Sequence, residues 1–256
     1  MRSKRRRPRV KIGHASKDEH GGSGWDGRAK AGDQTKAEVY TRSWYNGNWD
    51  FVLRCKDSAK AEKMARACEA ACANDCIGYD QSQRNTLNTQ AKLVGYDLAR
   101  IKTDCECDCS SLMTVCAQAA GIAVPYSAGN APRTATMKKD FTATGMFEVL
   151  TDIFYRNTDA YLKRGDILVR AGHHTAMVLQ DGTGKALPIL QRGMSGDFVK
   201  QMQELLCKKG YKIDCDGKFG DKTKTALLKF QTSAFPQEPK QWDGICGPRS
   251  WEALQK

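Results

Sequence analysis

This 256-residue chain lacks several features, and each absence excludes a class of protein. No stretch approaches the roughly 18 continuous apolar residues of a membrane-spanning helix, so we expect no membrane insertion. The basic start, Met1–Arg9, is followed by no apolar run, so we expect no secretory signal peptide and a cytoplasmic location. We interpret residues 1–9 as a disordered basic arm, with an electrostatic tether to an anionic polymer as the alternative.

Metal-binding patterns are also scarce. The chain has four histidines, and its cysteines do not form the paired Cys-x-x-Cys or Cys/His spacings of zinc sites, so we predict no metal and no other cofactor. Eleven cysteines are nevertheless many for a cytoplasmic protein. We expect small buried thiols plus one reactive thiol, while disulfides among Cys207, Cys215 and Cys246 stay open.

Positive charge is what the chain has in excess, with a formal net charge of +12. A surface this basic favours nucleic acid, an anionic membrane or an anionic wall polymer, and charge alone does not choose among them. The length allows one medium domain and a small one. A glycine-punctuated turn at Asp181–Lys185 and a break at Pro188 predict domains over 10–185 and 190–256, joined by a linker at 186–189.

The first of these blocks shows an α+β pattern. Its apolar runs and helical spacings predict the following elements: strands over Val10–Ala15, Glu38–Arg42 and Phe51–Arg54; helices over Ser58–Asn74, Ser82–Val94 and Ser110–Ala120; and strands over Asp166–Arg170 and Thr175–Gln180.

Cys109 and His174 are the candidate reactive residues of this block. A thiol at a helix N-terminus meets unpaired N–H groups and the positive end of the helix dipole, which lowers the thiol pKa toward thiolate. A histidine on a neighbouring strand can take that proton and later pass it to a leaving amine. Because successive strand residues face opposite sides, only one of His173 and His174 can face the thiol, and we expect His173 to be exposed.

This arrangement resembles the NlpC family of papain-like cell-wall peptidases and the related phage amidases. The resemblance rests on Asp108-Cys109-Ser110 at a helix start, Gly165-Asp166 at a strand start, and His174 before a small-residue apolar run. It implies that Cys109 is the nucleophile and His174 the base, while we expect Asp108 and Ser110 to cap the helix. In the family a further polar residue on the following strand orients the imidazole, and no suitable residue follows here.

The segment Lys11–Ser16, however, resembles that missing strand. We therefore predict a circularly permuted arrangement, in which the first strand takes the place of the last and His14 orients His174. The alternative is that His14 lies on a surface strand. Tyr79 and Asp80 are the candidate substrate-binding residues, and for Tyr79 a buried structural role is the alternative.

The second block repeats Asp-Gly-x-x-Gly at Asp216–Gly220 and Asp243–Gly247, each time before a predicted helix. Apolar spacing predicts three short helices: Asp197–Lys209, Lys222–Thr232, and a last one containing Trp251 and Leu254. The block resembles the three-helix peptidoglycan-binding domain common at the ends of bacterial and phage wall hydrolases. A wall-binding role follows from this resemblance and from no single residue.

Together the resemblances imply a phage endolysin-type peptidoglycan hydrolase of α+β class, with a papain-like NlpC-type catalytic domain followed by a small three-helix domain. It would cut a stem-peptide amide, either as an endopeptidase between D-γ-glutamyl and the diamino acid or as an N-acetylmuramoyl-L-alanine amidase. We expect a monomer whose partners are peptidoglycan and its anionic polymers, not nucleic acid, and which stays in the host cytoplasm until lysis. The alternatives are a catalytically inactive wall-binding protein, a nucleic-acid-binding protein and a metal-dependent amidase.

Overall fold

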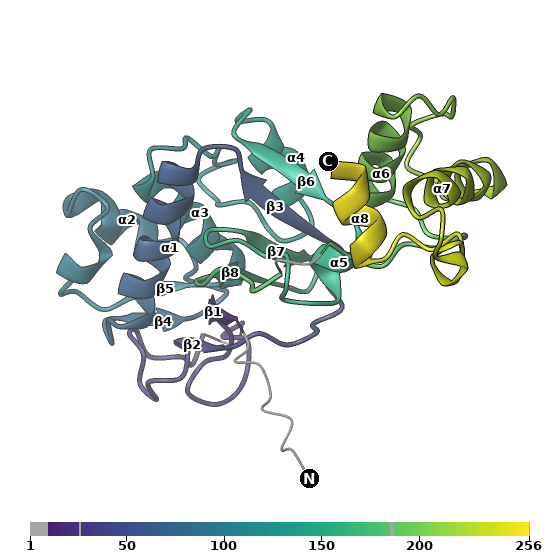
Figure 1. The fold of residues 1–256 in the computed structure, drawn as a ribbon. Helices are drawn as coiled ribbons and strands as arrows, with labels where there is room; N and C mark the ends of the chain where they lie inside the picture. Colours follow the sequence, from purple (N-terminus) through teal and green to yellow (C-terminus); the bar gives the residue numbers. More distant parts are fainter. Residues whose placement is uncertain (1–9, 26, 185–186, 256) are drawn as a thin grey trace, which may run out of the picture. The chain divides into compact units, whose positions relative to one another are not determined.

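The computed structural model describes residues 10–25, 27–184 and 187–255 (Figure 1). The chain divides into two compact units. Unit 1 runs through Thr151 and resumes over Tyr155–Thr183, and unit 2 comprises Asp152–Phe154 and the chain from Gly184 onward. The predicted basic arm at residues 1–9 lies outside the described residues, as does Ala186 of the predicted linker.

Unit 1 mixes helices and strands, as the α+β prediction requires. In chain order its elements are β1 (Lys11–Ala15), β2 (Val39–Ser43), β3 (Phe51–Cys55), α1 (Ser58–Cys72), β4 (Ile77–Tyr79), α2 (Thr86–Leu93), the 3-10 turn η1 (Leu98–Arg100), β5 (Cys105–Cys107), α3 (Cys109–Ala119), α4 (Met137–Thr142), β6 (Phe147–Leu150), β7 (Ile167–Arg170) and β8 (His174–Val178). A short helix, α5 (Ile153–Arg156), starts in the segment that belongs to unit 2.

A six-stranded sheet in the order β2-β1-β8-β7-β3-β6 forms the centre of unit 1, and all its neighbouring strands are antiparallel. The first strand therefore pairs with the last, with Ile12 opposite Val178 and Gly13 opposite Met177. A separate parallel pair joins β4 and β5. The pairing of β1 with β8 brings residues from the two ends of unit 1 side by side.

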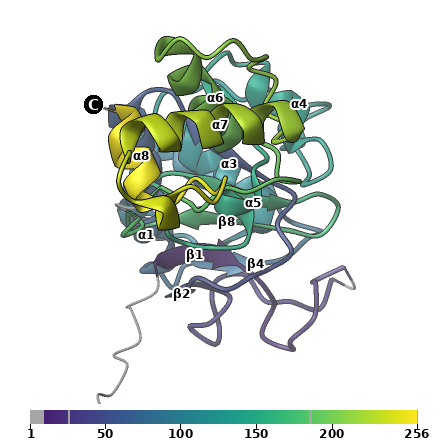
Figure 2. The same ribbon diagram turned by 45° about the vertical axis from the view of Figure 1, so that its right-hand side comes forward.

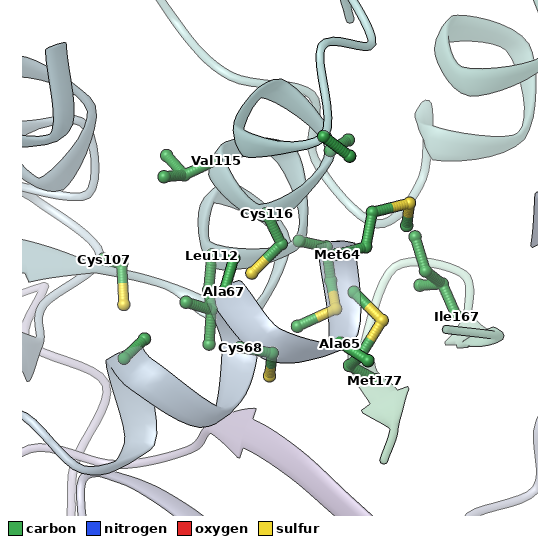
Figure 3. Close-up of a cluster of buried hydrophobic side chains, with 14 of the residues drawn as sticks. Met64, Ala65, Ala67, Cys68, Cys107, Leu112, Val115, Cys116, Ile167 and Met177 are labelled. Atoms are coloured by element: carbon green, nitrogen blue, oxygen red, sulfur yellow. The ribbon is translucent and has the colours of Figure 1, made fainter. Parts of the chain in front are cut away.

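Helices α1 and α3 pack against each other over one face of the sheet, and small residues allow the close approach (Figure 3). Gly13 of β1 is one of them, because a Cβ there would lie 2.7 Å from the Cys68 sulfur of α1. Figure 3 shows Cys68 of α1 and Cys116 of α3 among the buried side chains of this core. On the other face, Trp49 covers a second apolar cluster with Ile12 and Val178.

The cysteines are free thiols throughout. Cys68 hydrogen-bonds with Cys116 and Cys72 inside the core. The contact with Cys116 and burial hold the Cys68 pKa well above its ordinary value, against the opposing effect of Cys72. Such thiols are unreactive packing residues. In unit 2 the Cys207 and Cys215 thiols are hydrogen-bonded, with their sulfurs 3.3 Å apart and no disulfide between them, and Cys246 is buried.

Unit 2 contains α6 (Asp197–Lys208), α7 (Asp221–Ala234), the 3-10 turn η2 (Pro239–Gln241) and α8 (Pro248–Gln255), as Figure 2 shows. The three predicted helices are confirmed. The repeated Asp-Gly turns share one hydrogen-bond plan, each centred on a buried glutamine. Gln203 donates to Asp216 Oδ1, Lys218 O and Thr223 Oγ1 and accepts from Gly217 N, and Gln231 makes the corresponding bonds with Asp243, Ile245, Ser250 and Gly244.

One predicted helix of unit 1 is shorter than expected. The sequence favours helix from Ser82, but α2 begins at Thr86. Asp80 Oδ1 accepts hydrogen bonds from the N–H groups of Ser82 and Gln83 and holds this stretch in a turn. An aspartate that bonds to the next backbone N–H groups competes with the helix in this way.

Candidate active site

Cys109 is the first residue of α3, and Asp108 caps that helix. Asp108 Oδ1 accepts from the Ser111 N–H at 2.7 Å, and Ser111 Oγ accepts from the Asp108 N–H at 2.8 Å, which together form a capping box. The predicted cap by Asp108 is confirmed, but its partner is Ser111 and not Ser110. The cap fixes the Cys109 thiol at the helix N-terminus.

The environment of that thiol differs from the prediction. Burial raises the pKa of Cys109 to about 12, and the charge of Asp108 adds to the increase. Arg84 and the N–H groups of Thr175 and Ser110 oppose it. The dipole at a helix terminus stabilises a nearby charge by about 0.3–1 kcal/mol. This is less than the roughly 1.4 kcal/mol that corresponds to a pKa shift of one unit. The expectation that the helix N-terminus moves the thiol toward thiolate is therefore wrong, because desolvation outweighs it.

Cys109 reaches the sheet where two strands separate. The pairing of β1 with β8 covers Ile12–Gly13 and Met177–Val178, so Thr175 lies beyond it on β8. The Thr175 N–H bonds to the Cys109 thiol instead. Because Thr175 follows His174 directly, the thiol lies at the start of the strand that carries the candidate base.

His14 and His174 contact each other at this point. Nδ1 of His14 lies 2.8 Å from Nε2 of His174. The strand register explains the contact, because Ile12 stands opposite Val178. His14 lies two residues after Ile12 and His174 lies four residues before Val178, so both side chains fall on the same face of the sheet. His173 lies exposed in the preceding turn, as expected.

Both imidazoles are neutral at pH 7. Burial, together with the nearby His174 and Arg42, lowers the pKa of His14 to about 3. Burial and Arg42 lower the pKa of His174 to about 4, against a small opposing effect of Asp108. Aromatic rings enclose the pair: Tyr40 lies 4.6 Å from His14, and Trp49 stacks 6.2 Å from His174, measured between ring centroids. The enclosure accounts for the desolvation.

Tyr79 and Asp80, the two predicted substrate-binding residues, are both buried. Tyr79 ends strand β4, and its hydroxyl accepts a hydrogen bond of 2.9 Å from Gln81 Nε2. Burial raises the pKa of Tyr79, and the charge of Cys109 is the next cause, which places the phenol near the thiol. Asp80 is 0% exposed and binds the turn that follows it, so its burial does not favour substrate contact.

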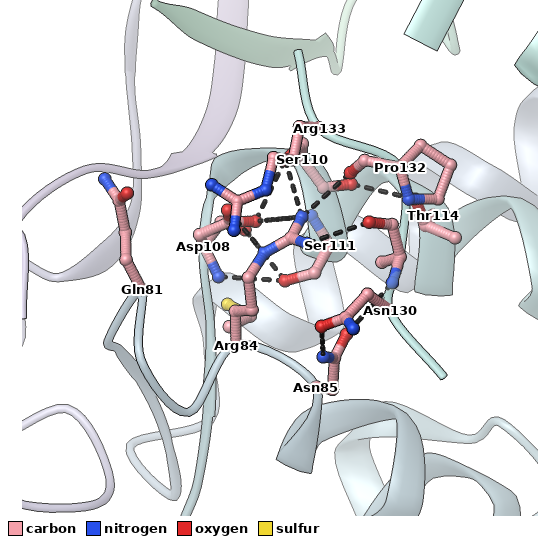
Figure 4. Close-up of polar contacts among 12 residues, drawn as sticks. Gln81, Arg84, Asn85, Asp108, Ser110, Ser111, Thr114, Asn130, Pro132 and Arg133 are labelled. Carbon is pink, nitrogen blue, oxygen red and sulfur yellow. Dashed lines mark hydrogen bonds and ion pairs between the residues drawn. The ribbon is translucent and has the colours of Figure 1, made fainter. Parts of the chain in front are cut away.

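The sequence prediction missed Arg84, whose side chain is only 3% exposed. Its guanidinium binds both Asp108 carboxylate oxygens, at 2.7 and 3.1 Å, and the Ser110 hydroxyl at 2.9 Å (Figure 4). It also donates to the carbonyls of Ala131 and Pro132, each at 2.8 Å. No spacing in the sequence connects position 84 to position 108, because the contact depends on the loop between them.

Unit 1 thus pairs His14 with His174 and places the Cys109 thiol against the backbone of Thr175, the residue after His174. Tyr79 lies near the thiol, and Arg84 binds Asp108, which caps the helix. Across the described residues, no group of three or more His, Cys, Asp or Glu side chains is placed to hold a metal ion. The helices in the described part of the chain are all too short or too polar to span a membrane.

Comparison with known proteins assigns families to both blocks. Residues 12–185 match the family described as an endolysin-like domain, and residues 195–254 match the putative peptidoglycan binding domain. A probable N-acetylmuramoyl-L-alanine amidase of Bacillus licheniformis is 34% identical over 104 residues, which is 40% of this chain and 27% of the amidase. An uncharacterized protein in the bpoA1 3' region of Kitasatospora aureofaciens is 41% identical over 75 residues, 28% of this chain and 60% of that protein.

Among solved structures, a peptidoglycan-binding protein from Clostridioides difficile, in complex with glutamine hydroxamate, is 25% identical with a TM-score of 0.25. The match covers 45% of this chain and 62% of that one. The chain spans about a quarter of the amidase and three fifths of the second relative. The predicted combination of an endolysin-like domain with a peptidoglycan-binding domain is confirmed.

Proposed function

The chain belongs to the endolysin-like domain family, and from this premise we propose that it is a peptidoglycan hydrolase that cuts a stem-peptide amide by a Cys109–His174 mechanism. The observation that supports the proposal is that the helix-start thiol of Cys109 bonds to the Thr175 N–H, directly after His174, which in turn pairs with the buried His14. Unit 1 would then be an NlpC-type papain-like domain in circularly permuted order, with β1 in the place of a strand that normally follows β8.

The resting site holds a thiol and two neutral imidazoles. His174 therefore acts as a general base during the attack, not as one half of a preformed ion pair. Its Nε2 contacts His14, so Nδ1 is the nitrogen that takes the thiol proton. As that proton leaves, the Cys109 sulfur bonds to the amide carbon, and N–H groups at the start of α3 stabilise the oxyanion.

The second half of the reaction uses the same proton. His174 returns it to the amine nitrogen as the carbon–nitrogen bond breaks, leaving a thioester on Cys109. His174 then deprotonates a water that attacks the thioester, and the thiol is regenerated. In the tautomer that leaves Nδ1 free, Nε2–H of His174 donates to Nδ1 of His14, so His14 orients the base.

Unit 2 would hold the enzyme on its polymeric substrate. Its family match is to a peptidoglycan-binding domain, and the net charge of +12 favours walls that carry anionic polymers. The partial match to a probable N-acetylmuramoyl-L-alanine amidase is compatible with the amidase alternative. The endopeptidase alternative, between D-γ-glutamyl and the diamino acid, is equally served by this chemistry.

Digestion of purified peptidoglycan under reducing conditions tests the proposal. Wild type, Cys109→Ala and Cys116→Ala are compared, with Cys116 as a matched buried thiol from the same helix. Released fragments are identified by mass spectrometry. We expect wild type and Cys116→Ala to release fragments and Cys109→Ala to release none.

The fragments also identify the bond. New N-termini within stem peptides indicate an endopeptidase, and intact stems freed from sugar indicate an amidase. A wild-type protein that sediments with walls but releases nothing would instead be a wall-binding protein with an inactive domain. Full activity in Cys109→Ala would remove the cysteine mechanism while leaving the wall assignment.

A further inference from the structure

Unit 1 contains a pocket whose wall is connected through Arg84 to Asp108, the residue that caps α3. It has a volume of about 430 Å³ and is lined by residues between Pro125 and Asp140, so we call it the 125–140 pocket. The residues that matter for its chemistry are Tyr126, Asn130, Arg133, Lys139 and Asp140. No sequence motif pointed to this segment.

The wall of the 125–140 pocket is tied directly to the nucleophile's helix. One nitrogen of Arg84, Nη2, donates both to an Asp108 carboxylate oxygen at 3.1 Å and to the Pro132 carbonyl at 2.8 Å (Figure 4). Asp108 is covalently next to Cys109. Arg84 and Asp108 therefore link the wall of the pocket to Cys109.

Hydrogen bonds also brace one wall of the 125–140 pocket. Ser127 and Asn130 exchange two backbone hydrogen bonds of 2.9 Å around a tight turn at Ala128–Gly129. Asn85 accepts from the Ala131 N–H at 3.1 Å and donates to the Asn130 side chain at 2.9 Å. A preformed wall lowers the entropy lost when a ligand is held.

The charged residues that line the pocket are two cations, Arg133 and Lys139, and one carboxylate, Asp140, and this excess of positive charge favours an anionic ligand. Arg133 and Lys139 both line the pocket, and no carboxylate of the residues described by the structure lies within ion-pair distance of either cation. The Tyr126 hydroxyl is buried and has no hydrogen-bond partner among the described residues. Arg133 also lies over the ring of Trp25, 5.4 Å from its centroid, and Trp25 is 54% exposed.

We propose that the 125–140 pocket is a substrate subsite that binds a free carboxylate of the stem peptide, with the Arg133 guanidinium as the pairing cation and Tyr126 as a hydrogen-bond donor. This inference rests on the proposed function. A γ-linked glutamyl residue keeps its α-carboxyl group free, and it lies close to the scissile amide for both candidate bonds. Arginine with a carboxylate is among the strongest polar pairs available to a protein.

The test uses two soluble stem-peptide substrates that differ only in whether the glutamyl α-carboxyl is free or amidated. The full-length wild type is compared with Arg133→Gln and with Arg100→Gln, an exposed control that removes the same charge outside the pocket. We expect Arg133→Gln to raise KM about tenfold for the free acid, with kcat little changed, as befits a charge-assisted hydrogen bond. On the amidated substrate Arg133→Gln should match wild type, and Arg100→Gln should match wild type on both.

A smaller change should follow Tyr126→Phe, about threefold in KM for the free acid, as for one lost hydrogen bond of ordinary strength. Equal effects of Arg133→Gln on the two substrates, or an equal effect of Arg100→Gln, would overturn the carboxylate assignment. If wild type cleaves neither substrate, binding of both peptides to Cys109→Ala is measured instead. If only the free acid binds and its binding depends on Arg133, the subsite is supported and the hydrolase proposal is rejected. If the peptides are cleaved with a KM that does not depend on Arg133, the hydrolase is supported and the subsite is rejected.

Discussion

Replacing Arg84 with methionine tests how the N-terminus of α3, the helix that begins at Cys109, is stabilised. Arg84 and Asp108 are both buried, and their bidentate contact neutralises the Asp108 carboxylate. Methionine keeps much of the aliphatic volume but leaves that carboxylate buried without its cation. Breaking a buried pair in this way costs about 3–5 kcal/mol. For a unit of this size each kcal/mol lowers Tm by about 2–4 °C, so we expect the unit 1 transition to fall by about 6–20 °C.

Scanning calorimetry of the full chain is the assay, because the unit 2 transition serves as an internal reference and a single two-state fit is not valid for two units. The double variant Arg84→Met/Asp108→Asn is the decisive control. Asparagine keeps the helix cap but removes the charge, so at least half of the lost stability should return. A loss below 1 kcal/mol in Arg84→Met, or no recovery in the double variant, would refute the reasoning.

Three further predictions follow from other buried groups. Burial raises the pKa of Glu106 to about 8, while its Oε1 accepts from the Gly32 N–H. A raised carboxyl pKa stabilises the folded state at low pH, and this contribution is lost between about pH 4.5 and 8. Glu106→Gln should therefore flatten the fall in unfolding free energy over that range, and an unchanged pH slope would contradict the prediction. Gln231→Ala removes a buried side chain that makes four hydrogen bonds, and it should lower the unfolding free energy of unit 2 by about 2–4 kcal/mol without affecting unit 1. Equal losses in both transitions would show instead that the units unfold together. Because the pKa of His174 is about 4 and the base must be neutral, kcat/KM should persist from pH 7 to about pH 4 before falling, and a fall centred near pH 6.5 would mean that the imidazole is not desolvated.

Sequence reasoning reached the local elements of the candidate site and the proximity of the first strand to the strand that carries His174. Apolar periodicity located β1, β3, α1, α3, β7 and β8 to within a few residues, because each element carries its own pattern. The contact between His14 and His174 came from a resemblance of Lys11–Ser16 to a missing strand, and the structure places the two rings 2.8 Å apart. Their catalytic roles stay predictions.

Sequence reasoning could not predict contacts between residues far apart in the chain, or the free-energy cost of burying a charge. The strands β4 and β5 are three residues each, too short for a periodic signal, and they pair in parallel although residues 80–104 separate them in the sequence. In the sequence Arg84 looks like any surface arginine, because its burial depends on contacts with the distant carbonyls of Ala131 and Pro132. The pKa of Cys109 depends on how much of its surroundings is protein, so the helix dipole alone gave the wrong direction.

Trapping the covalent intermediate tests the central claim most directly. Wild type and Cys109→Ala are mixed with a stem-peptide substrate, quenched in acid within milliseconds to seconds, and analysed by intact-mass and peptide mass spectrometry. We expect an acyl adduct on the peptide that contains Cys109. The adduct should be absent from Cys109→Ala and longer-lived when His14 is replaced by alanine. Turnover without any adduct, or an adduct on another cysteine, would contradict it.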